Sequence, residues 1–102
     1  GINVIVSRNQ SGPGARNIED DNIELTKNGT TSVGSNLAVG GTWPASLTDI
    51  TYAGGLWGTT WTPAEVNAAT FGVRIRVEAT GGGGSRQANI DHVRVQVIYL
   101  VP

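Results

Sequence analysis

The first residues of the chain alternate apolar and polar side chains, as a strand with one buried face does. Ile2, Val4 and Val6 fall on one parity, and Asn3 and Ser7 fall on the other. Because successive side chains of a strand point to opposite faces, this pattern predicts a strand from the start of the chain.

The middle of the chain contains further strand patterns and one helix signal. Residues 18–27 form a predicted strand with its apolar side chains inward, followed by Asn28-Gly29, a pair favoured in two-residue type I′ hairpin turns, and a return strand at 30–33. A further strand is expected over 47–52. Thr62-Pro63-Ala64-Glu65 has the form of a capping box with proline at the first helical position. It predicts one short helical turn near residues 63–69, crossing between two sheets.

The last third has the clearest alternation, in two stretches joined by a glycine-rich turn at 81–85. We expect the two stretches to pair as a long C-terminal hairpin. In the second stretch, Ala88 and Ile90 lie on the opposite parity to the later apolar residues, which predicts a β-bulge near Asp91-His92. The apolar positions concerned are Phe71, Val73, Ile75, Val77 and Ala79, then Val93, Val95, Val97, Tyr99 and Val101.

These elements together predict an all-β fold. Seven or so short strands with a long C-terminal hairpin are typical of an antiparallel two-sheet β-sandwich, either jelly-roll or immunoglobulin-like. The length of 102 residues corresponds to a single domain over 1–102.

Composition narrows the function classes. Charged residues make up 15 % of the chain, and Lys+Arg 7 against Asp+Glu 8 gives a net charge of −1, so we expect neither a nucleic-acid nor a membrane partner. The chain has no cysteine, which excludes disulfides and thiolate metal sites, and its single histidine, His92, excludes any site that needs two imidazoles. We expect no cofactor and no catalytic site.

The three tryptophans, Trp43, Trp57 and Trp61, are the most suggestive residues. Two interpretations remain open. Tryptophan is the largest core filler in a chain with one Phe and two Tyr, and packing is the favoured role. The alternative is an exposed aromatic platform that binds a glycan.

Three other groups of residues are candidate sites. Glu19, Asp20 and Asp21 carry oxygen ligands of the kind that Ca²⁺ prefers, but without an EF-hand spacing, so a solvated acidic loop is the favoured interpretation. His92 beside Asp91 is read as a structural histidine at the bulge. Arg74, Arg76 and Arg94 are expected to share the solvent face of the last hairpin, either as a subunit contact or as a solvated face.

The most specific blocks of the sequence are Leu56-Trp57-Gly58, Trp61-Thr62-Pro63-Ala64-Glu65 and Asp91-His92-Val93-Arg94. In these blocks the chain resembles a β-sandwich module of bacteriophage virion proteins and bacterial extracellular proteins. The resemblance covers nearly the whole chain. Relatives usually have strand-forming sequence before the first strand found here. The resemblance therefore implies a domain that lacks N-terminal strands or belongs to a longer chain, or a fold completed by a neighbouring subunit.

The function expected from these observations is structural. The chain is expected to be a non-catalytic assembly module of a phage virion (capsid decoration or tail fibre) or of an extracellular fibre. It would act by self-association and contacts at strand edges, with itself or other virion or surface proteins as partners. A carbohydrate-binding module that uses exposed tryptophans is the alternative.

Overall fold

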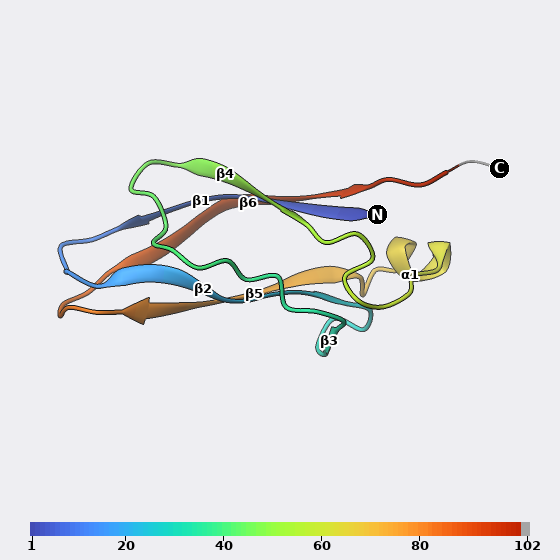
Figure 1. Ribbon diagram of the computed structural model, residues 1–102, viewed down its shortest axis with the longest axis horizontal. Coiled ribbons are helices and arrows are strands. Elements are labelled where there is room, and N and C mark those ends of the chain that lie inside the picture. The colour runs from blue at the N-terminus through green and yellow to red at the C-terminus, as the bar shows by residue number, and fades with distance from the viewer. Residues whose placement is uncertain (101–102) are drawn as a thin grey trace.

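The computed structural model describes residues 1–100 and has two antiparallel three-stranded sheets packed face to face (Figure 1). The molecule is elongated, with dimensions of 52 × 23 × 22 Å. The expected all-β two-sheet sandwich is confirmed. Its elements are β1 (Ile2–Ser11), β2 (Asn17–Thr26), β3 (Ser32–Val33), β4 (Thr48–Ala53), α1 (Pro63–Asn67), β5 (Gly72–Thr80) and β6 (Gln87–Val97).

The sandwich has one covered flank and one open flank. One sheet has the order β4-β1-β6 and the other β3-β2-β5. Segment 34–44 follows the edge of β2 that β5 leaves free: Leu37 N–H donates to the Ile23 carbonyl at 2.9 Å, and Trp43 N–H to the Ile18 carbonyl at 2.8 Å. This segment and β4 therefore cover one flank, and β5 and β6 border the other.

The bulge predicted in β6 is confirmed. His92 lies opposite Ser7 and Ile90 lies opposite Arg8, so Asp91 has no partner in β1. The extra residue lets apolar side chains before and after it share the inward face. β6 ends at Val97, earlier than the alternation predicts, and Val101 lies outside the described residues.

The expected C-terminal hairpin is wrong. β5 and β6 follow each other in the chain but pair with β2 and β1 in opposite sheets. Alternation specifies which face of a strand is buried, not which strand lies beside it. The connecting glycines let the chain cross between the layers instead of turning back within one, with Gly81, Gly82 and Gly84 at positive φ.

The type I′ turn expected at Asn28-Gly29 is also wrong, although β2 and β3 do pair. Thr26 lies opposite Ser32, so the loop spans residues 27–31. The Asn28 side-chain oxygen accepts hydrogen bonds from the N–H groups of Thr30 and Thr31, at 2.9 and 2.8 Å. Asn28 thus organises a wider loop through its side chain, and only Gly29 takes a positive φ there.

The helix prediction is confirmed in detail. The Thr62 hydroxyl accepts from Glu65 N–H, and the Glu65 carboxylate accepts from Thr62 N–H at 2.8 Å. α1 lies between β4 and β5 in the chain and so joins the two sheets, as expected. Within residues 1–100, no helix is long and apolar enough to cross a membrane, since α1 has five residues.

The core lies between the sheets toward the α1 end. Its fully buried side chains come from β1, β2, β4 and the loop before α1. Gly34 illustrates how tightly this loop is held: it has φ +73°, and a Cβ there would lie 1.9 Å from the Trp57 carbonyl oxygen. The buried members are Ile2, Val4, Val6, Ile23, Leu25, Tyr52 and Trp57.

Candidate functional site: an open flank of the sandwich

A buried polar cluster lies on the covered side of the sandwich, and sequence reasoning missed it. The Asp20 carboxylate accepts from Arg8 Nη1 at 2.5 Å, from the Tyr52 hydroxyl at 2.6 Å and from Trp43 Nε1 at 2.8 Å. The Arg8 guanidinium also lies 4.7 Å from the centre of the Trp43 ring. Oδ1 of Asp20 accepts from Arg8 and Trp43, and Oδ2 accepts from Tyr52 and from the Val39 N–H at 3.2 Å. The cluster ties β1, β2, β4 and segment 34–44 together.

Tyr52 stays protonated in this cluster. Burial, and then the hydrogen bond to Asp20, raise the pKa of its phenol well above the usual value near 10. The hydroxyl therefore remains a donor to Asp20. Because the pKa of Tyr52 is higher in the folded than in the unfolded chain, the protonated hydroxyl contributes its full stability below about pH 10. This contribution is lost as the pH rises from there through the folded pKa.

A signal for this cluster is present in the sequence. Ile18 and Ile23 have opposite parity, so β2 needs a bulge to bury both, and the register does shift between Asp20 and Asn22. Before that bulge, Asp20 shares the inward parity of Ile18. Arg8 likewise continues the inward parity of β1. An inward Arg and an inward Asp on neighbouring elements point to a buried pair.

The carboxylates of the calcium candidate are separated. Asp20 is buried and bound to Arg8, whereas Asp21 binds Arg76 Nε at 3.1 Å on the outer face, and Glu19 binds the Thr80 hydroxyl. Alternation along β2 sends these side chains in different directions. Within residues 1–100, no group of three or more His, Asp or Glu side chains is placed to hold a metal ion.

Two of the three tryptophans are core residues. Trp43 and Trp57 are 1 % and 0 % exposed, and their indole N–H groups donate to Asp20 and to the Ile2 carbonyl. Their ring faces are not accessible to a sugar, so the platform interpretation is wrong for both. Trp61 is half-buried, packed edge-on against Phe71 and covered by Lys27 Nζ, 4.9 Å from its ring centre.

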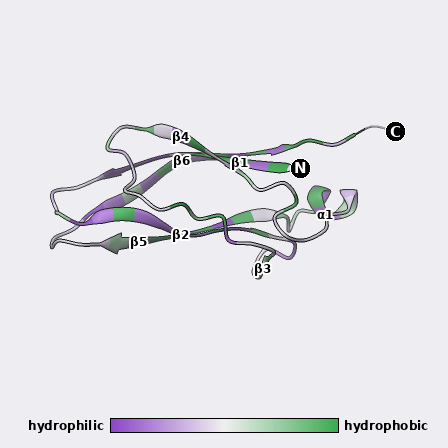
Figure 2. Ribbon diagram, viewed as in Figure 1, coloured by the Kyte–Doolittle hydropathy of each residue, from purple (hydrophilic) through white to green (hydrophobic). Residues whose placement is uncertain are grey.

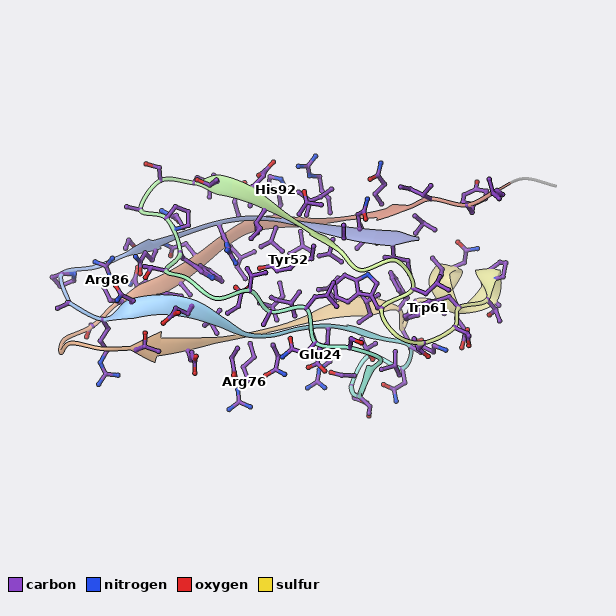
Figure 3. The ribbon with its side chains drawn as sticks, viewed as in Figure 1. Glu24, Tyr52, Trp61, Arg76, Arg86 and His92 are labelled. Atoms are coloured by element: carbon purple, nitrogen blue, oxygen red, sulfur yellow. The ribbon has the colours of Figure 1, made fainter. Side chains whose placement is uncertain are left out.

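The three arginines do not share a face. Arg74 and Arg76 lie on the outer face of β5, while Arg94 lies on the outer face of β6 and binds Asp49 at 2.8 Å. In Figure 3, Arg76 points out of the layer containing β5, and His92 lies on the opposite outer side. The expected common stripe fails because the two strands belong to different sheets.

The bulge brings Asp91 and His92 together on the surface. The Asp91 carboxylate lies 2.8 Å from His92 Nδ1, and both side chains are about half exposed. Ser7 is the β1 partner of His92, but it is buried.

The open flank exposes side chains that the alternation predicts to be buried. Val93, Val95 and Val97 of β6 are 38–39 % exposed, whereas Val4 and Val6, opposite them in β1, are at most 1 % exposed. β6 is thus accessible from both faces along most of its length. Within residues 1–100, no strand pairs with the outer edge of β5 or of β6.

The apolar surface continues beyond β6 toward α1. Figure 2 shows hydrophobic residues following the chain past the end of β6. A groove of about 500 Å³ lies there, and its lining is mostly apolar. Tyr99 and Leu100 at its rim are 75 % and 96 % exposed. The lining includes Ile2, Leu56, Trp61, Val66, Val97 and Ile98.

The backbone of β6 presents unpaired groups at its free edge. Ile98 N–H donates to the Gly1 carbonyl at 2.8 Å, and the Gly1 amino group donates back to the Ile98 carbonyl at 2.6 Å. Hydrogen-bonded pairs alternate along an antiparallel ladder. Val93, Val95 and Val97 therefore direct their N–H and C=O groups away from β1. A free strand edge beside exposed apolar side chains is a template for another strand.

Comparisons of this chain with protein-family models, with curated proteins and with solved structures found no match.

Proposed function

We propose that this chain is a non-catalytic structural module that assembles with further copies through its open flank. The supporting observation is β6: three inward valines are more than a third exposed beside an unpaired strand edge. Apolar surface of this kind is stabilised when another chain covers it. A phage virion or an extracellular fibre, the settings that the sequence resemblance implies, is the proposed location.

The charge distribution also supports this function. Natural edge strands are usually protected by lysine, by inward-pointing charge or by proline. β6 has none of these between Val93 and Val97 on its inward face, and its cationic residue, Arg94, points outward. A net charge of −1 gives copies little mutual repulsion.

The carbohydrate-binding alternative is less well supported. It requires exposed aromatic faces, and Trp61 alone of the three tryptophans has partial exposure. Its ring already contacts Phe71 and Lys27.

The substitution Val95→Lys tests the proposed surface. It places an inward charge on the free edge strand, and we expect it to convert the assembled protein to monomers because the charge would be buried at the interface. Val95 is 39 % exposed in the single chain, so the lysine can reach solvent there and the fold should persist. Sedimentation velocity measures the assembly, and far-UV circular dichroism checks the fold.

Gln96→Lys is the matched control. It adds the same charge one residue away, on the outer face of β6, where Gln96 bonds with Asn3. We expect this variant to assemble like the unmodified protein. Equal assembly of Val95→Lys and Gln96→Lys would show that the open flank is not the contact surface.

A further inference from the structure

The edge of β5 carries a charge pattern that complements itself. Along its outer face, Arg76 is followed two residues later by Glu78. The Arg76 side chain is 77 % exposed and points away from the sandwich (Figure 3). A partner strand running antiparallel beside β5 would face these two charges.

The backbone of β5 fixes which residues can pair with such a partner. Ile23 N–H donates to the Asn36 side chain, and its carbonyl accepts from Leu37, so Ile23 directs its backbone away from β5. Its partner Ile75 is then in a non-hydrogen-bonded pair and directs its own groups to the free edge. The same holds for Asp20, which lies opposite Val77. Ile18 has the same parity as Asp20, and its N–H donates to the Gln10 side chain while its carbonyl accepts from Trp43, both on the side of β2 away from β5. Val77 therefore also faces the free edge.

We infer that a second copy of this chain pairs antiparallel with β5, about a two-fold axis at Val77. Val77 then lies opposite Val77 of the other copy, and the two exchange backbone hydrogen bonds. Arg76 of each copy lies opposite Glu78 of the other, on the same face and within reach of an ion pair. A two-fold contact of this type is the commonest closed form of self-association. The inference rests on the proposed assembly function and specifies its first contact.

Charge selects this register from the others that the backbone allows. A two-fold axis at Ile75 would place Arg74 opposite Arg76, which is destabilising because like charges face each other. Axes at Val73 or Ala79 would place no acidic residue opposite Arg76. Axes at Arg74, Arg76 or Glu78 would place that charged residue opposite the same residue of the other copy, which is destabilising for the same reason. Of these registers, the one centred on Val77 alone forms two reciprocal pairs of opposite charge without placing like charges opposite each other.

The same axis also covers the exposed valines. β5 and β6 border one flank, so a copy that pairs with β5 brings its own β6 beside this one. The inward side chains of Val93 and Val95 then face the partner's apolar flank instead of water. The apolar interior of each copy, open along this flank in the single chain, is then continuous with that of its partner.

Reciprocal charge reversal tests the register. Arg76→Glu places two glutamates opposite each other at both contacts, and Glu78→Arg does the same with arginines. We expect each single variant to weaken self-association about ten- to hundredfold in sedimentation velocity. The double variant Arg76→Glu/Glu78→Arg restores the pairs within one sequence. An equimolar mixture of the two single variants restores them between sequences.

Arg16→Glu is the control for net charge, since Arg16 is exposed in the loop before β2. We expect it to associate like the unmodified chain. If the unmodified chain associates but the reversals behave like Arg16→Glu, or the double variant and the mixture are not rescued, the register is wrong while the assembly function stands. An unmodified chain that stays monomeric would overturn both.

Discussion

Replacing Asp20 with alanine is expected to lower the free energy of unfolding by about 3–5 kcal/mol, since it leaves the buried Arg8 charge without its partner. Arg8 is 6 % exposed, so water does not compensate. The loss also removes the acceptor for Tyr52, Trp43 Nε1 and the Val39 N–H. Urea denaturation followed by circular dichroism measures the change.

Two variants serve as references for Asp20→Ala. Asp21→Ala removes the neighbouring carboxylate, whose ion pair with Arg76 is exposed, and should cost at most about 1 kcal/mol. Arg8→Ala/Asp20→Ala should lose less than the sum of the two single variants, because neither charge is then left unpaired. Equal effects of Asp20→Ala and Asp21→Ala would contradict the buried cluster.

Trp57→Ala is expected to be similarly destabilising, by about 3–5 kcal/mol. Trp57 is fully buried, and its indole N–H donates to the Ile2 carbonyl at 2.8 Å. The backbone carbonyl of Trp57 accepts from Ser35 N–H at 2.7 Å, so the loop that the buried indole holds in place is also the loop that contacts segment 34–44. The same denaturation experiment gives the loss.

Trp61→Ala is the comparison for Trp57→Ala, because Trp61 is only half-buried and should cost clearly less. Iodide should leave most of the tryptophan emission unquenched, since Trp43 and Trp57 are shielded. Strong quenching together with a loss below 1 kcal/mol for Trp57→Ala would place Trp57 at the surface instead.

Alternation and capping rules predicted the individual elements well. The strands at both ends of the chain, the bulge at Asp91 and the capping box at Thr62 all follow from local patterns. These features depend on side chains within a few residues of one another. Local chemistry is therefore sufficient to specify them.

The pairing of the strands was not predictable in the same way. β5 and β6 each carry a correct face pattern, yet the chain between them crosses the sandwich and separates Arg76 from Arg94. Asp20 appears in the sequence as one of several acidic residues, and its burial depends on a bulge and on Arg8 from another strand. The open flank could not be predicted either, because the alternation in β6 is that of a strand with one buried face. The valines of β6 are exposed because the strand order places β6 at the edge of its sheet. Alternation therefore predicts which face of a strand is buried, but not which strands lie beside it.

The native mass of the protein in solution tests the central claim most directly. Sedimentation velocity across a range of concentrations should give a species of at least two chains, above the 10.6 kDa of one chain, because the apolar flank needs a partner to cover it. A single 10.6 kDa species at every concentration would contradict the account, since the valines of β6 would then remain in water.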